Sequence, residues 1–186
     1  MEKLTLDKAK ELLQKHTTEK HLLIHAAAVG AAMGAMAEHF GEDKEHWQAI
    51  GYLHDVDFEK FPEEHCKHVR ELLEPENIST EDIETIISHG YGLATDEIKP
   101  ETNCQKSLFA VDELTGIVHA YSLMRPEGME GMSVKSFKKK FKDKRFAAKC
   151  NREVITKGAE DLGMELSLLM ELCIKGMSEH ADELKE

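Results

Sequence analysis

KHLLIHAAAVGAAMGAMAEHF, residues 20–40, is the stretch of sequence that decides the fold. Alanine, methionine and other small or apolar residues occupy nearly every face of the helix that it would form. A helix that is apolar all round is normally buried. Gly41 follows, and glycine commonly ends a helix. We therefore predict a central buried helix over residues 20–40.

Helical patterns continue on both sides of this stretch, with short breaks at glycine and proline. No segment alternates β-branched and polar residues as a strand would. The chain of 186 residues has the length of one ordinary domain. We predict an all-α bundle in a single domain, residues 1–186, with further helices over residues 4–16, 44–54, 63–74, 103–124, 133–142, 153–162 and 165–177, and one that begins near 79–83.

Composition limits the classes of function. The formal net charge of −12 argues against broad binding to nucleic acid, which requires a basic surface. No apolar stretch is read as a membrane span of about 20 residues, and the amino terminus lacks the apolar region of a signal peptide. The four cysteines are scattered and form no CxxC pair, which favours reduced thiols. We expect a cytoplasmic protein without a membrane partner.

A His-Asp pair, His54-Asp55, ends an apolar helical stretch. Adjacent residues on a helix point about 100° apart, so both side chains can reach one metal only where the helix ends or loosens. His25 lies inside the buried-looking helix, and Asp112 lies among apolar residues of a later one. A carboxylate in an apolar setting is costly unless it is paired or bound to a metal. These four residues are the candidate ligands of a metal.

The order His25…His54-Asp55…Asp112 resembles the H…HD…D signature of the HD-domain superfamily of metal-dependent phosphohydrolases. The segments His-Ala-Ala-Ala-Val-Gly, Gly-Tyr-Leu-His-Asp and Ala-Val-Asp around these residues resemble it too. The resemblance implies a helical bundle with a metal pocket between its central helices, one or two divalent ions, and hydrolysis of phosphate esters or anhydrides. It covers about residues 20–125, the expected metal-binding core, and leaves a helical extension at about 126–186.

Two further histidines resemble those of the superfamily members that bind two metals. His65 begins His-Cys-Lys-His-Val-Arg-Glu-Leu-Leu, and His89 follows Ile-Ser. His68, three residues after His65 on a helix, could exchange roles with it. Ser88 and the Gly90-Tyr91-Gly92 segment differ from the motif of relatives that act on cyclic dinucleotides, so the resemblance does not extend to that activity.

Imidazole and carboxylate ligands suit iron, manganese, cobalt, nickel or zinc. Such an ion lowers the pKa of bound water and neutralises charge on a phosphoryl oxygen. We expect His25, His54, Asp55 and Asp112 to hold the first ion. His65 and His89 would help hold a second ion or contact phosphate. His54 and Asp55 form the catalytic pair, and Asp55 bridges the ions.

Basic residues provide candidate contacts for an anionic substrate. The run KSFKKKFKDKR, residues 135–145, is strongly basic in an acidic chain. One interpretation is a solvated helix face that docks through Phe137 and Phe141, and the alternative is that its lysines steer a substrate toward the metals. Predicted substrate contacts are Lys60, Arg125, Lys138 and Lys139.

The leading functional prediction is hydrolysis of a phosphomonoester or a nucleotide-type phosphate by metal-activated water. The partner would then be a small phosphorylated molecule, nucleotide-like in character. A second interpretation is a module that retains metal and senses a nucleotide or a protein partner without turnover. A third is oxygenase chemistry, which some di-iron members of the superfamily perform.

Overall fold

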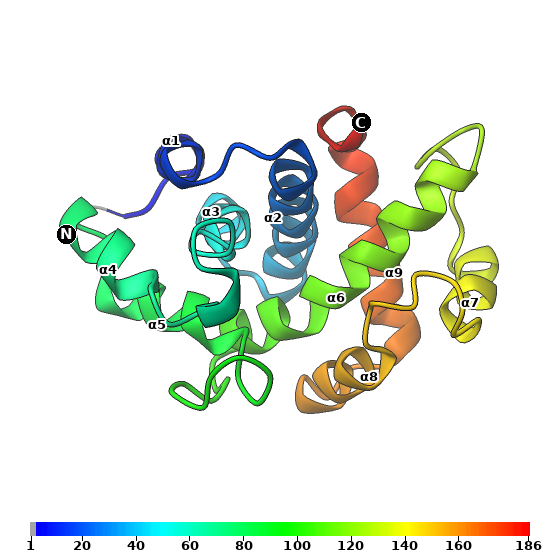
Figure 1. Cartoon of the computed structure of the whole chain (residues 1–186). Coiled ribbons are helices and arrows are strands. Elements are labelled where there is room, and N and C mark those ends of the chain that lie inside the picture. Colours follow the sequence, from blue (N-terminus) through cyan, green and yellow to red (C-terminus); the bar gives the residue numbers. More distant parts are fainter. Residues whose placement is uncertain (1–2) are drawn as a thin grey trace.

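The computed structural model describes residues 3–186, and these residues form an all-helical fold without a strand. A single bridge between Tyr91 and Thr95 is the one piece of β-type pairing among them. Figure 1 shows the order of the elements. The α-helices are α1 (Leu6–His16), α2 (Lys20–Phe40), α3 (Lys44–Leu53), α4 (Val69–Leu73), α5 (Thr80–Ser88), α6 (Asn103–Met124), α7 (Val134–Lys142), α8 (Arg152–Asp161) and α9 (Leu166–Glu179), and the 3₁₀ helices are η1 (Pro62–Glu64), η2 (Glu74–Glu76) and η3 (Ala181–Leu184).

Helix α2 lies in the centre of the fold, as predicted. It packs against α3 on one side and α9 on the other, and α6 crosses it. Met33 and Met36 are fully buried. Gly41 ends the helix in the left-handed conformation, with φ 68°. Because α3 and α9 pack on α2, and α5 and α8 pack on α6, these two helices form the framework of the site described below.

Helix α2 also corrects one expectation about membranes. By length and composition alone it could cross a bilayer, with a mean hydropathy of 1.2 over an 18-residue window. In the fold, 72% of that window is buried. The core helix of a soluble protein meets the same criterion, so the hydropathy of α2 is explained by its place in the core.

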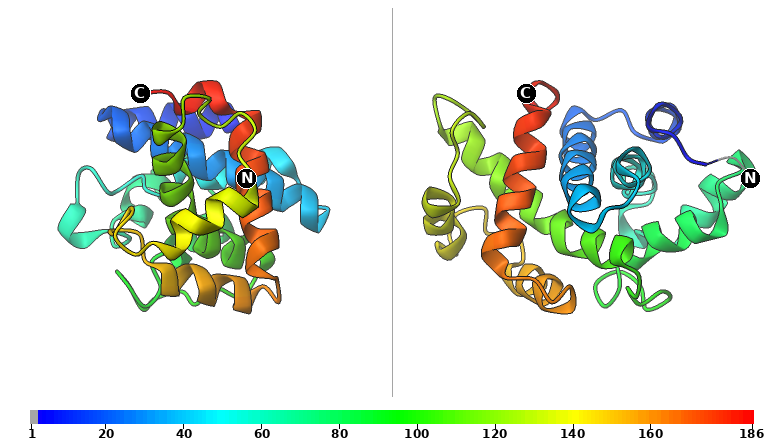
Figure 2. Two further views of the ribbon diagram at one scale, coloured as in Figure 1. Left: turned by 90° about the vertical axis from the view of Figure 1, so that its right-hand side faces the viewer. Right: turned by 180° about the vertical axis from the view of Figure 1, so that it is seen from behind.

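The carboxy-terminal helices pack on the framework of α2 and α6. Helix α9 contacts α2, α8 contacts α6, and α7 contacts both α6 and α9. Phe137 and Phe141 of α7 are buried, as the docking interpretation of the basic run predicts. The Arg152 guanidinium donates hydrogen bonds to several backbone carbonyls of the chain that leaves α7, including Ala147 O at 2.7 Å. Figure 2 shows α7 and α8 at the outer edge of the bundle.

The predicted helix over residues 63–74 is wrong. The chain forms the 3₁₀ turn η1, leaves it at His65 with φ −53° and ψ 137°, and passes through Cys66 in the left-handed conformation with φ 73° before α4 begins. The break turns the His65 side chain toward buried Asp57, whose carboxylate also accepts the His68 backbone N–H. A tertiary contact therefore overrides a helical sequence pattern.

Candidate metal centre

A close crossing of α2 and α3 brings the first two histidines together. A Cβ atom on Gly51 would lie 2.8 Å from Val29 O and 2.9 Å from Gly30 Cα, so the two backbones touch where side chains would hold them apart. The short connection between the helices makes them antiparallel. His25, about one turn before the crossing on α2, therefore faces His54, three residues beyond Gly51.

The first group of donor atoms joins α2, the end of α3 and α6. His25 Nε2 lies 2.9 Å from Asp112 Oδ1 and 3.2 Å from His54 Nε2, and His54 Nε2 lies 3.1 Å from Asp112 Oδ1. Asp55 Oδ2 approaches His25 Nε2 at 3.6 Å. Atoms that ligate one ion at 2.0–2.2 Å lie about 2.8–3.6 Å apart, from octahedral to tetrahedral geometry. The spacing of this group fits a shared ion.

The second group surrounds the other oxygen of the same carboxylate. Asp55 Oδ1 lies 3.2 Å from both His65 Nε2 and His89 Nε2, and the two imidazole nitrogens lie 3.1 Å apart. His54 Nε2 is 3.3 Å from Asp55 Oδ1. Asp55 thus lies between the two groups, with its side chain 19% exposed.

Hydrogen bonds fix which imidazole nitrogen is free. His54 and His89 each cap the end of a helix, α3 and α5, and each directs Nδ1 to a carbonyl three residues earlier, Gly51 O at 2.6 Å and Ile86 O at 2.5 Å. A carbonyl only accepts, so both Nδ1 atoms carry a proton, and in the neutral rings both Nε2 atoms present a lone pair. This is the arrangement that orients metal-ligating histidines.

The Nδ1 atom of His65 is also committed to a hydrogen bond, in this case with the side chain of Asp57. His65 Nδ1 donates to Asp57 Oδ1 at 2.9 Å, which leaves Nε2 as the acceptor. His65 Nε2 and His89 Nε2 therefore meet lone pair to lone pair at 3.1 Å. Such a contact is repulsive unless a proton or a cation lies between the two atoms. The donor set fits a divalent metal.

Residues 22–116 match the family model of the HD domain, and this span is slightly more than half of the chain. The chain belongs to the HD-domain family. No curated protein and no solved structure matched the chain. Members of the family are mostly metal-dependent hydrolases, and HD domains bind divalent metals. The matched span contains His25, Asp112 and every other predicted ligand of this HD domain.

The charges of the cluster favour positive charge at its centre. Burial by itself lowers the pKa of His54, but the Asp55 and Asp112 carboxylates raise it to about 9. Burial also lowers the pKa of His65, and its hydrogen bonds to Asp55 and Asp57 raise it to about 12. Burial raises the pKa of both Asp55 and Asp112, and the charge of His54 holds each below its usual range. A bound cation would take the place of the protons on these imidazoles.

Two residues beside the HD-domain site escaped the sequence analysis. Asp57 is fully buried and orients His65. The sequence feature that could have revealed Asp57 is an acidic residue between two apolar residues, Val56 and Phe58, directly after the His-Asp pair. Cys66 places Sγ 3.8 Å from His89 Nε2. Burial raises the pKa of this thiol, and the charges of His89 and His65 outweigh burial and lower the pKa to about 7. No spacing rule pointed to Cys66.

His65 and His68 are not interchangeable in the structure. The His68 ring stacks on Phe61 with centroids 3.7 Å apart, and its Nδ1 meets Glu71 Oε2 at 2.7 Å. These contacts direct the His68 side chain away from the donor groups. The left-handed residue between the two histidines removes the shared helical face on which the exchange depended.

The predicted substrate contacts do not gather at the cluster. Lys60 Nζ lies 2.7 Å from His16 Nδ1 on the exposed side of the chain. Arg125 donates to the carbonyls of Gly128 and Glu130, and it follows Asp112 by 13 positions on one helix, about 20 Å at 1.5 Å per residue.

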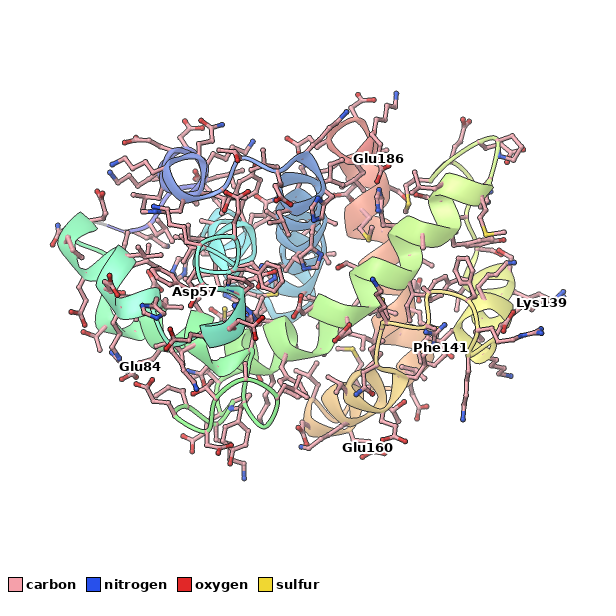
Figure 3. The ribbon with its side chains drawn as sticks, viewed as in Figure 1. Asp57, Glu84, Lys139, Phe141, Glu160 and Glu186 are labelled. Atoms are coloured by element: carbon pink, nitrogen blue, oxygen red, sulfur yellow. The ribbon has the colours of Figure 1, made fainter. Side chains whose placement is uncertain are left out.

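The lysines of α7 lie farther out. In Figure 3, Lys139 lies at the right-hand edge of the molecule with its side chain pointing outward, whereas Asp57 lies inside the molecule, left of its centre. Lys138 precedes Lys139 on the same helix, which packs on α6 and α9. The structure places Arg125, Lys138 and Lys139 away from the donor groups, and their contact with substrate stays a prediction. Sequence spacing does not show where a basic run lies relative to a distant pocket.

Proposed function

We propose that the chain is a metal-dependent phosphohydrolase that cleaves a phosphomonoester or a nucleotide-type phosphate. The observation that carries the proposal is one carboxylate, Asp55, lying between two groups of inward-facing donors. Two ions that flank an oxygen-rich bridge are the usual arrangement for in-line displacement at phosphorus. The membership of the chain in the HD-domain family supports the same class of reaction.

The residues of the site have distinct roles in this proposal. His25, His54 and Asp112 would hold the first ion, His65 and His89 the second, and Asp55 both. When bound, a divalent ion supplies a water molecule of lowered pKa and neutralises charge on the phosphoryl oxygens.

Two further features of the protein support these roles. The carbonyls of Gly51 and Ile86 hold the imidazoles in orientation, so little reorganisation is needed when substrate arrives. The partly exposed side chains of His25 and Asp112, at 28% and 23%, leave the first group open to solvent and substrate.

A cavity lined by residues close in sequence to His89 and Asp112 suits the organic part of a substrate. Its volume is about 220 Å³, and Tyr91, Leu93 and Phe109 supply apolar surface. Tyr91 follows His89 by two residues, and Phe109 precedes Asp112 by about one turn of α6. Lys99 also lines the cavity and offers positive charge to a phosphate group. These features favour an organic phosphate with a planar or apolar group, such as a nucleotide, over inorganic phosphate.

The cysteines and the overall charge support a proposal for the location and partners of the protein. We propose a cytoplasmic protein that acts on a small phosphorylated molecule. The four cysteines are all free, which agrees with a reducing compartment. The acidic overall charge disfavours long nucleic acids as partners.

The test combines metal analysis with a substrate screen. The purified chain is loaded with manganese, zinc, iron, cobalt or nickel and assayed against nucleotides and phosphomonoesters, beside Asp55→Asn and the control Asp182→Asn. Asp182 is 96% exposed in its side chain, so the control makes the same change of charge at the surface.

The proposal expects metal-dependent release of phosphate by the parent chain and the control, and loss of both bound metal and turnover in Asp55→Asn. Equal metal content in Asp55→Asn and the parent would refute the metal site. Tight nucleotide binding without turnover in any metal form would replace the enzyme with a sensor.

A further inference from the structure

We propose that Cys66 supplies a thiolate ligand to the second ion position, beside His65 and His89, so that this position selects a thiophilic ion such as zinc over magnesium. The inference rests on the proposed function, because it assigns a further ligand to the same site. It would make the two ion positions chemically different, with nitrogen and oxygen donors at the first and a sulfur donor at the second.

The thiol lies within the second donor group. Cys66 is 1% exposed, and one ligand atom from each of Cys66, His65 and His89 lies within 4.8 Å of the other two. The other fully buried cysteine, Cys173, shows the contrast, since its Sγ meets the Met177 thioether at 3.8 Å. Cys66 is therefore placed among metal-ligating groups, and Cys173 is placed in the apolar core.

The distances match the edges of one coordination polyhedron. In a tetrahedral zinc site, with Zn–N near 2.0–2.1 Å and Zn–S near 2.3 Å, nitrogen atoms lie about 3.3–3.4 Å apart and sulfur lies about 3.6 Å from nitrogen. The structure has 3.1 Å between His65 Nε2 and His89 Nε2. Cys66 Sγ lies 3.8 Å from His89 Nε2. Asp55 Oδ1, 3.2 Å from both imidazoles, supplies a fourth donor.

An independent observation points to a cation here. The Nδ1 protons of His65 and His89 are both committed, to Asp57 and to Ile86 O. In the neutral rings both Nε2 atoms therefore present lone pairs to each other, although they lie 3.1 Å apart and His89 is 4% exposed. Two buried nitrogen atoms held at this distance require a positive centre between them, which a metal ion supplies.

The backbone conformation at Cys66 and the glycine at position 90 place the Cys66 sulfur near His89. Cys66 has φ 73°, a left-handed conformation that residues with a Cβ atom rarely adopt and that tends to occur at functional sites. Gly90, directly after His89, leaves the space that the thiol fills, because a Cβ atom there would lie 2.6 Å from Cys66 Sγ. The strained turn and the glycine together bring Sγ to His89.

The chemistry of the donors predicts the selectivity. Thiolate is a soft ligand that favours zinc and other thiophilic ions, whereas magnesium prefers oxygen ligands. Replacement of the Cys66 sulfur by the oxygen of serine should therefore weaken zinc binding much more than manganese binding. If the Cys66 thiol served only the packing of the fold, its replacement by serine would change the stability of the fold and leave the preference between zinc and manganese unchanged.

Cobalt(II) is the probe for the experiment, because a thiolate ligand gives cobalt a strong near-ultraviolet charge-transfer absorption that nitrogen and oxygen ligands do not give. The full chain is titrated with cobalt, beside Cys66→Ser and the control Cys104→Ser. We expect the absorption in the parent and in Cys104→Ser and its loss in Cys66→Ser. Zinc affinity at the second position should fall tenfold or more in Cys66→Ser, with manganese affinity changed far less.

Each outcome decides the inference. Binding of two cobalt ions without the absorption would overturn the thiolate ligand and leave the proposed function standing, whereas failure to bind any cobalt would overturn both. If Cys66→Ser does not fold, a variant that keeps Cys66 as its single cysteine replaces it. The absorption must then persist, and its absence from that folded variant would refute the proposal.

Discussion

Asp57 should control metal affinity without touching the metal. Its two carboxylate oxygens accept two hydrogen bonds, one from His65 Nδ1 at 2.9 Å and one from the His68 backbone N–H at 3.2 Å. Asp57→Asn keeps the size of the side chain and replaces one acceptor with an N–H donor. Either His65 Nδ1–H or the His68 backbone N–H then points at the amide N–H of the asparagine, and two donors meet in a fully buried place. The His65 ring therefore loses its fixed orientation, or the turn at residues 65–68 shifts.

The magnitude follows from the two bonds. Loss of a partner that orients a ligating histidine costs about 10–100-fold in metal affinity, or about 1.4–2.7 kcal/mol. A buried donor without an acceptor costs about 1–3 kcal/mol of folding free energy. We expect the affinity of the second ion position to fall by that factor and the affinity of the first position to change little, because the hydrogen bonds of Asp57 go to His65 and to the His68 backbone.

The assay is competition between the protein and a chromophoric chelator for zinc and for manganese, with both binding steps resolved. Urea unfolding of the metal-free protein measures the folding cost separately, and Asp182→Asn is the control for the lost charge. Unchanged affinity of the second ion in Asp57→Asn would show that Asp57 does not orient His65 as described. A large fall in the affinity of the first ion would show that the two groups are not separate.

Three further predictions test the fold, its pH dependence and its metal. Gly51→Ala adds a Cβ atom 2.8 Å from Val29 O and should lower the free energy of unfolding in urea by about 1–3 kcal/mol while weakening metal binding; an unchanged value would contradict the close crossing of α2 and α3. The hydrogen bond from half-buried His46 to Asp82 raises the pKa of His46, so its stabilisation is complete below pH 6.5 and fades as pH rises through the raised pKa. His46→Gln should therefore lose more stability, measured by urea unfolding, at acid than at alkaline pH, and exposed His39→Gln should show no such trend. Removal of the metal by a chelator should lower the free energy of unfolding. The fall should be about 4.1 kcal/mol for protein that was saturated at a free ion concentration 1,000 times Kd, and a Tm that does not respond to chelator would contradict the metal site.

Local patterns predicted most of the helices. The all-round apolar pattern of residues 20–40 requires burial wherever the rest of the chain lies, and the structure has α2 with those bounds. Capping residues act within one turn, so Ser79 marks the start of α5 as expected. The segment 63–74 failed because its conformation depends on Asp57, a partner outside the segment, and short-range patterns carry no information about such a contact.

In the candidate site, too, some residues could be predicted from the sequence and others depend on tertiary contacts. The residues of the H…HD…D signature were named from their order along the chain, and the structure brings His25, His54 and Asp112 into contact. Asp57 and Cys66 were missed because their roles arise from a buried hydrogen bond and a left-handed backbone, which residue type and spacing do not reveal. Lys139 shows the opposite case, since the charge of a residue is visible in the sequence and its distance from a pocket is not.

The shared carboxylate of Asp55 has a consequence for how the protein fills with ions. One negative charge serves both positions, so the ion that arrives first reduces the attraction for the second and adds its own repulsion. Loading should be stepwise, with the weaker step coupled to the stronger by the same free energy in either order. Protein purified from a metal-poor medium should then be a mixture of singly and doubly filled molecules, and at equal purity its specific activity would vary with the growth medium.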